Sequence, residues 1–276
     1  MSQAAAFVEA SKIQERTGWG ERAESYGLLT GRITARLVDP LLDAAGVAAG
    51  TQVLDVGTGP GYAADRASER GAIVSGVDIA EEMVALARRR HGGIRFLRAD
   101  AEDLPFPERS FDALVGNLAI NHLPRPERAM REFARVVRPG GRIALSAWDV
   151  PERTRFLGIL RDALRECCVA DPYEASRPDP FRFADDDELR RLLRGAGLGA
   201  VEVRSVSLTH HVADVDQLWR GMLGGSVRAA GLVTRQPPRT RARIRASVAR
   251  LADEYRVAGG GLTIPARAKI ASGRRP

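Results

Sequence analysis

The chain has 276 residues, of which 44% are apolar and 28% are charged, and its formal net charge is +7. This length and balance predict one globular domain of ordinary size with added covering segments. The longest apolar runs are too short to span a bilayer, and Glu9, Lys12 and Glu15 interrupt the stretch where a secretory signal needs an unbroken apolar core. We therefore expect a cytoplasmic protein with no membrane partner.

The excess of positive charge is local, because eleven Arg and Lys residues fall within residues 232–276, against only Asp253 and Glu254. No aromatic side chains alternate with these arginines as a platform for bases, so we expect no nucleic-acid partner. The excess of positive charge remains compatible with a small anionic molecule as the partner. The adjacent pair Cys167 and Cys168 has no usual metal-ligand spacing, and we expect no metal.

Short apolar runs alternate with amphipathic helical stretches through the first half of the chain, which is typical of a parallel sheet with crossover helices. The predicted strands lie at residues 53–57, 72–78, 94–100, 111–117, 142–148, 201–207 and 262–271, and the clearest helices between them at 81–89 and 126–137. The pattern predicts an α/β fold, a Rossmann-like doubly wound seven-stranded sheet that is mostly parallel, with the last two strands forming an antiparallel pair at one edge.

The remaining segments are predicted to cover the sheet. We expect a helical N-terminal cover over residues 1–46, a core formed by residues 47–207 and 261–276 with residues 149–183 inserted, and a helical substrate cover over residues 208–260. Within the last cover, Ile244, Val248 and Leu251 recur at helical spacing, so the arginine-rich stretch after Pro238 is predicted to be an amphipathic helix with its arginines in solvent.

The turn after the first predicted strand has three glycines, Gly57, Gly59 and Gly61, in the order G-x-G-x-G. Such a turn lets a ligand approach the backbone closely and face the N–H groups at the start of a helix. A dinucleotide-binding turn would read G-x-G-x-x-G, so a nucleotide-binding oxidoreductase is disfavoured. Asp78 follows the second strand, where a carboxylate can accept hydrogen bonds from both hydroxyls of a ribose.

Five stretches together resemble the class I S-adenosylmethionine-dependent methyltransferases, in particular the small-molecule branch that includes the ubiquinone and menaquinone methyltransferases. These stretches are VLDVGTGPG, GVDIAEEM, RADAEDLPF, FDALVGNLAINHL and EFARVVRPGGRIALSAW, in the order that the family has. The resemblance covers about residues 48–148 and implies S-adenosylmethionine as the cofactor. Thr58 departs from the family at a position that is often cysteine.

The resemblance implies that the glycines line the methionine end of the cofactor, that Asp55 supports the loop and the ammonium group, and that Asp78 holds the ribose. The residues expected to bind cofactor are Tyr26, Asp55, Gly57, Thr58, Gly59, Gly61, Asp78, Ile79, Met83, Asp100, Ala101, Glu102, Asn117 and His122. The residues expected to contact the acceptor are Trp19, Tyr26, Trp148, Trp219 and Met222. For several of these aromatic and sulfur-containing side chains, packing in the core is the competing interpretation.

The histidines are the candidates for a general base, which an acceptor with a neutral hydroxyl or an acidic carbon would require. His122 follows the fourth strand and is expected at the rim of the pocket. His210 and His211 are expected just after the sixth strand, where neighbours on an extended chain point in opposite directions, so only one of them could face the substrate.

The sequence thus predicts transfer of a methyl group from S-adenosylmethionine to an O, N or C atom of a small molecule, such as a secondary metabolite. The resemblance concerns cofactor binding only, so an enzyme that keeps the cofactor while catalysing a cyclisation or rearrangement is the alternative.

Overall fold

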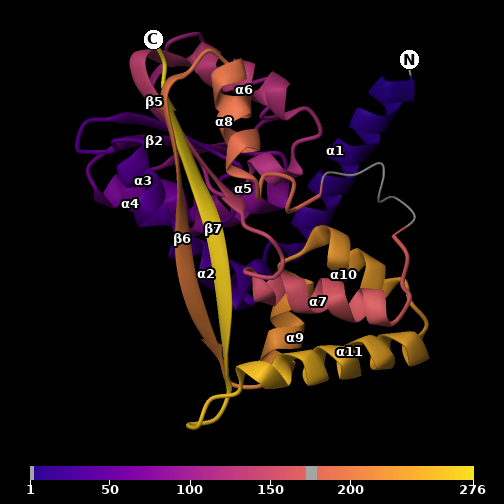
Figure 1. Ribbon diagram of the computed structural model, residues 1–276. Helices are drawn as coiled ribbons and strands as arrows, with labels where there is room; N and C mark the ends of the chain where they lie inside the picture. Colours follow the sequence, from indigo (N-terminus) through magenta and orange to yellow (C-terminus); the bar gives the residue numbers. More distant parts are fainter. Residues whose placement is uncertain (1–2, 172–178) are drawn as a thin grey trace.

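One seven-stranded sheet organises the computed structural model, which describes residues 3–171 and 179–276 (Figure 1). The strands lie in the order β3-β2-β1-β4-β5-β7-β6. Their bounds are β1 Gln52–Val56, β2 Ile73–Asp78, β3 Arg95–Arg98, β4 Phe111–Gly116, β5 Val137–Trp148, β6 Gly199–Val212 and β7 Leu262–Arg274. Strands β1 to β5 are parallel, and β7 runs antiparallel to β5 and β6. The predicted fold class is confirmed, with β7 one place inside the edge and β6 outermost.

Helices cover both faces of the sheet because each parallel crossover carries the chain over one face. On one face lie α3 (Val38–Ala44), α4 (Tyr62–Glu69) and α5 (Glu81–Arg90), and on the other lie α6 (Pro126–Val136) and α8 (Asp186–Gly195). Neighbouring residues of β1 show the alternation, since Val53 packs into the cluster with α3 and α4 while Leu54 packs into the cluster with α6. Such strands are apolar throughout because both faces are buried.

Strands β6 and β7 are longer than the sequence predicts, and they extend beyond the sheet as a two-stranded ribbon (Figure 1). The expectation that His210 and His211 follow the sixth strand is wrong, because both pair within it, with Ile264 and Thr263. The ribbon continues because every second residue from Leu262 in β7 is apolar and buried against helices. The predicted boundary at residue 208 therefore falls inside a strand.

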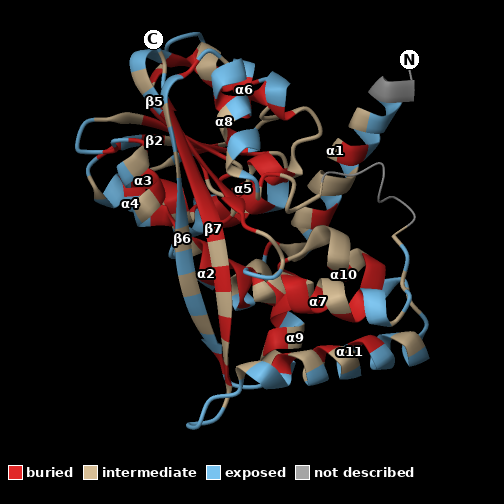
Figure 2. Ribbon diagram, viewed as in Figure 1, coloured by how far each residue is buried: buried red, intermediate tan, exposed pale blue. Residues whose placement is uncertain are grey.

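A layer of helices packs beside this ribbon and forms a separate apolar cluster (Figure 1). Its helices are α2 (Thr30–Ala35), α7 (Arg155–Glu166), α9 (Val215–Gly224), α10 (Val227–Thr234) and α11 (Pro238–Ala252). In α11, Ile244, Val248 and Ala252 are buried, while the outer face, which includes Arg241 and Arg243, is exposed (Figure 2). The amphipathic interpretation of this arginine-rich stretch is confirmed.

The N-terminal helix α1 (Gln3–Arg22) and the turn η1 (Tyr26–Leu28) complete this side of the molecule. Residues 172–178 of the predicted insert lie outside the described residues. Within the described ranges, no helix combines the length and the apolar character needed to cross a bilayer.

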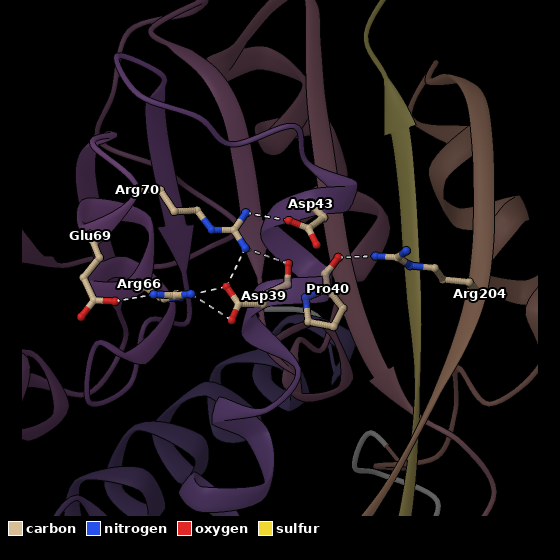
Figure 3. A network of polar contacts seen from close by, with 7 residues as sticks. All are labelled: Asp39, Pro40, Asp43, Arg66, Glu69, Arg70 and Arg204. Carbon is tan, nitrogen blue, oxygen red and sulfur yellow. Dashed lines mark hydrogen bonds and ion pairs between the residues drawn. The ribbon is translucent and has the colours of Figure 1, made fainter.

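An ion-pair network on the surface joins α3 to α4 (Figure 3). Asp39 accepts from Arg66 at 2.8 Å and from Arg70 at 2.5 Å, and these two guanidinium groups hold the pKa of the Asp39 carboxyl below its usual range. Arg204 of β6 donates to the carbonyl of Pro40 at 2.5 Å in the same region. Because these groups face solvent, the network orients the elements more than it stabilises them.

Candidate active site

A cavity lies at the carboxyl ends of β1, β2 and β4, where α/β sheets bind their ligands. Its volume is about 450 Å³, within the range of small-molecule pockets. Segments far apart in the sequence close it, including α1, the turn η2 (Ile120–His122), α7 and α10. Polar side chains gather at the strand ends, while the part lined by α7 and α10 combines apolar side chains such as Leu157, Leu164 and Leu232 with Arg161, Arg165 and Arg228.

Gly57 and Gly59 of the glycine-rich turn line this cavity, whereas the predicted Gly61 does not and faces His91 instead. Gly57, Gly59 and Gly61 all have positive φ angles, of 65°, 52° and 91°, which a residue with a Cβ adopts only at a cost. A Cβ on Gly57 would lie 2.5 Å from the Cβ of Ala119, whereas nothing lies within 4 Å of one on Gly59. A larger residue at position 57 would therefore clash with Ala119, whereas Gly59 leaves an open cradle, that is, free space for a ligand next to its backbone.

Asp55 supports this turn from behind and does not line the cavity. Its Oδ2 accepts a hydrogen bond from the Thr58 hydroxyl at 2.6 Å and one from the N–H of Ala64 at 3.1 Å. Burial, which disfavours the charged form, raises the pKa of Asp55 to about 7. The structure therefore places Asp55 and Thr58 as supports of the loop.

Asp78 lies at the end of β2 and lines the cavity. Its Oδ2 accepts from the N–H of Gly59 at 2.9 Å, and its Oδ1 accepts from the N–H of Ala80 at 3.0 Å. Burial is the largest cause of a raised pKa for this carboxyl, and these N–H groups oppose it. A carboxylate has about four acceptor sites in all, so Asp78 keeps capacity to accept from hydroxyls of a ligand.

Asp100 and Ala101 line the cavity beside Ile79 and Met83, while Glu102 lies behind them and is fully buried. Glu102 accepts from the N–H of Arg125 and from its guanidinium, both at 2.8 Å. Lys12 of α1 bridges the two acids, with Nζ 2.5 Å from Asp100 and 2.8 Å from Glu102. Glu102 thus anchors the loop that carries Asp100.

Asn117 follows β4, and both ends of its side chain are hydrogen-bonded within the protein. Its Nδ2 donates to the carbonyl of Thr34 at 3.0 Å, and its Oδ1 accepts from the hydroxyl of Ser146 at 2.7 Å. The next residue, Leu118, has a positive φ of 62°, a strained conformation for leucine. Asn117 and Leu118 both line the cavity.

His122 lines the cavity in contact with α1. Its Nδ1 lies 3.1 Å from Oε2 of Glu15, the same oxygen that accepts from the indole N–H of Trp19 at 2.9 Å. The Trp19 ring packs edge-on against His122 at 5.1 Å and against Tyr26 at 5.8 Å. Burial raises the pKa of Tyr26 to about 12, so its phenol stays protonated at neutral pH. The structure thus brings Trp19, Tyr26 and His122 together.

The apolar part of the cavity includes Trp148, at the end of β5, together with Leu157, Leu164 and Leu232. Trp148 packs edge-on against Phe156 at 5.1 Å, which fixes its ring as a wall. Trp148 is therefore a fixed part of the cavity wall.

Four other predicted residues lie away from the cavity. Met222 is buried in the core of the helical layer, and Trp219 packs against the same cluster, because α9 turns this face toward the core. His210 and His211 lie on the β6 ribbon, outside the cavity lining. Burial and the nearby Arg32 and Arg36 lower the pKa of His210.

Sequence reasoning missed several charged residues of the cavity, chiefly Lys12, Glu15 and Arg161. Lys12, Glu15 and Trp19 have the spacing i, i+3, i+7, which places them on one face of a helix. This spacing could have shown that the three residues share one face of a helix, but it does not show which part of the protein that face contacts. Across residues 3–171 and 179–276, no group of His, Cys, Asp or Glu side chains is arranged to hold a metal ion.

A doubly wound sheet with its cavity at the strand ends, a glycine turn with an open cradle, and a carboxylate after β2 fit an adenosine-containing cofactor. The fold and the cavity therefore define a Rossmann-like enzyme of the class that binds such cofactors.

Comparison with known proteins identifies the family. Residues 54–145 match the methyltransferase domain family. Demethylmenaquinone methyltransferase of Clavibacter sepedonicus is 31% identical over 209 residues, which are 71% of this chain and 80% of that protein. Methyltransferase GfsG of Streptomyces halstedii is 38% identical over 179 residues, 62% of this chain and 61% of that protein. The chain belongs to the class I S-adenosylmethionine-dependent methyltransferases, and its cofactor is S-adenosylmethionine.

Solved structures show the same fold. The [4+2]-cyclase SpnF superposes with a TM-score of 0.53 at 23% identity, over 88% of this chain and 81% of that chain. This likeness concerns the fold alone, because a shared fold does not establish a shared reaction.

Proposed function

We propose that this enzyme methylates an O, N or C atom of a small acceptor with a largely apolar body, of the kind found among secondary metabolites. The observation that carries the proposal is the single cavity that joins the polar strand ends to the apolar chamber under α7 and α10. The relatives that act on demethylmenaquinone support an acceptor of this type.

In this proposal the strand ends hold the cofactor. Asp78 accepts hydrogen bonds from the ribose hydroxyls, the backbone at Gly57 and Gly59 faces the methionine end, and Asp100 lies at the edge of the adenine. The free acceptor sites of Asp78 and the open space at Gly59 support these roles. Residues of α10, which belong to the proposed substrate cover, then close the acceptor side.

S-adenosylmethionine supplies a methyl group that is already activated by its sulfonium. The chain therefore needs chiefly to hold the nucleophilic atom in line with that methyl group and to keep water out. Trp19, Trp148 and Leu157 provide apolar walls around the space next to Asn117.

His122 can take a proton from a hydroxyl acceptor. If Nδ1–H donates to Glu15, Nε2 has a free lone pair, and the Glu15 carboxylate stabilises the imidazolium that forms after proton transfer. The same Glu15 oxygen holds Trp19, so the base and one wall of the pocket share an anchor.

The test is transfer of a labelled methyl group from S-adenosylmethionine to a panel of acceptors comprising a naphthoquinol, a phenol and an aromatic carboxylic acid. We expect label in an extractable product and an equal amount of S-adenosylhomocysteine. Conversion of a substrate without transfer of label would contradict the proposal and favour a cyclisation or rearrangement.

A further inference from the structure

The largely apolar chamber of the cavity has arginine side chains in its wall, and Arg161 is one of them. Arg161 of α7 lines the cavity together with Leu157, Leu164 and Arg165. These four residues have the spacing i, i+4, i+7, i+8, so one face of α7 turns toward the cavity. Arg161 is half-buried, and its guanidinium lies 5.5 Å from the ring centre of Phe181.

Each acidic side chain that lines the cavity already has a partner inside the protein. The pairs are Glu15 with Trp19 and His122, Asp78 with backbone N–H groups, Asp100 with Lys12, Asp171 with Arg228, and Asp179 with the N–H of Phe181. In contrast, Arg161 has no carboxylate within 4.0 Å among the residues that the structure describes. The carboxylates of the cavity thus pair with other groups and do not neutralise Arg161.

Arg155, on the same helix as Arg161, is an arginine with a structural role. Its guanidinium donates to Asp162 at 3.0 Å and to the hydroxyl of Tyr255 at 3.0 Å, which joins α7 to the turn after α11. Arg161 makes no such connection. A guanidinium in an apolar wall gains most from an anion that pairs with it there, because its planar donors match a carboxylate in a two-bond arrangement.

We propose that Arg161 binds a carboxylate of the acceptor, so that the substrate class is a small apolar carboxylic acid methylated at a different atom. The acid end then lies against α7, and the atom to be methylated points toward Asn117 and His122. Arg165, which is exposed, adds a second positive charge on the same face of α7. This inference rests on the proposed function, since it uses the same chamber as the acceptor site.

The test compares naphthoate with naphthamide, two probes of similar shape that differ in charge, by calorimetric titration of the protein saturated with S-adenosylhomocysteine. We expect the wild-type protein to bind naphthoate at least about tenfold more tightly than naphthamide, the effect of a charge-assisted pair. Arg161→Gln should reduce this preference to within about twofold, while Arg161→Lys should retain part of it.

Arg241→Gln is the matched control, because it removes one positive charge from the exposed face of α11, away from the cavity. It should keep the wild-type preference, and every variant should bind S-adenosylhomocysteine with unchanged affinity. Equal binding of the two probes by the wild-type protein, or a preference that persists in Arg161→Gln, would overturn the inference. Labelled-methyl transfer tests the proposed function separately, because a neutral acceptor can be methylated even when Arg161 has no role.

Discussion

Nδ1 of His122 lies 3.1 Å from Oε2 of Glu15, which joins a histidine after β4 to a glutamate of the N-terminal helix. The contact orients the imidazole, and it also fastens α1 to the rim of the cavity. The N-terminal helix, which lies outside the sheet motifs, thus completes the proposed site for proton transfer.

The first prediction concerns this pair. His122→Ala should lower turnover about a hundredfold, while the affinity for S-adenosylhomocysteine changes only a few-fold, because only the methyl-transfer step loses its general base. Glu15→Gln should lower turnover by about tenfold, since the amide keeps a hydrogen-bond acceptor but removes the stabilising charge. Steady-state kinetics and calorimetry measure the two effects. Equal losses in turnover and in cofactor affinity would instead indicate that His122 supports the cofactor site.

The second prediction concerns the ribose site. Asp78→Ala should weaken S-adenosylmethionine binding about ten- to a hundredfold, because charge-assisted hydrogen bonds contribute about 1.5–3 kcal/mol. Asp43→Ala is the control, as this carboxylate pairs with Arg70 on the surface. The role assigned to Asp78 fails if the dissociation constant stays at its wild-type value while circular dichroism shows an intact fold.

The sheet could be predicted from the sequence because its strands are short apolar runs with clear boundaries. Gly57, Gly59, Asp78 and Asp100 could be placed at the cavity for the same reason, since local sequence puts them at strand ends. The β6–β7 ribbon was predicted too short, because its outer half is defined by pairing with a segment fifty residues away and by the helices that cover β7.

The covering helices are where the sequence decided least. Trp219 and Met222 were candidates for acceptor contact with core packing as the competing interpretation, and the structure shows core packing, because α9 buries its apolar face and α10 supplies the cavity wall. Glu15 and Arg161 were missed because an isolated charge on a helix gives no sign of what it faces. Their positions depend on how α1 and α7 pack, which is a long-range property of the fold.

The third prediction separates ligand contact from backbone strain in the glycine turn. Gly59→Ala should weaken cofactor binding at least about tenfold, because the new methyl group enters the open cradle. Gly50→Ala is the control: Gly50 also has a positive φ, of 78°, with nothing within 4 Å of its Cβ position, but it lies outside the cavity. Both should lose about 1–2 kcal/mol of unfolding free energy, the cost of left-handed alanine. Equal cofactor affinity in the two variants would show that Gly59 does not contact the cofactor.

The fourth prediction concerns the buried Asp55, whose pKa is raised by burial to about 7. The folded state holds this proton up to about pH 7, whereas the unfolded chain releases it near pH 4, so this carboxyl lowers stability as pH rises between these values. Asp55→Asn keeps an acceptor for Thr58 and removes the titration. Its stability relative to wild type should therefore increase by up to about 4 kcal/mol from pH 4 to pH 8. Denaturant unfolding at several pH values measures this difference, and a constant difference would show that Asp55 is ionised throughout.

The most direct measurement is a crystal structure of the protein bound to S-adenosylhomocysteine, which locates the cofactor without knowledge of the acceptor. We expect both ribose hydroxyls within hydrogen-bonding distance of the Asp78 carboxylate and the adenine beside Asp100. The sulfur should lie next to the backbone of Asn117 and face the chamber that contains Trp148 and Arg161. A ribose bound to other residues, or a sulfur turned away from this chamber, would contradict the assignment of the cavity as a methyl-transfer site.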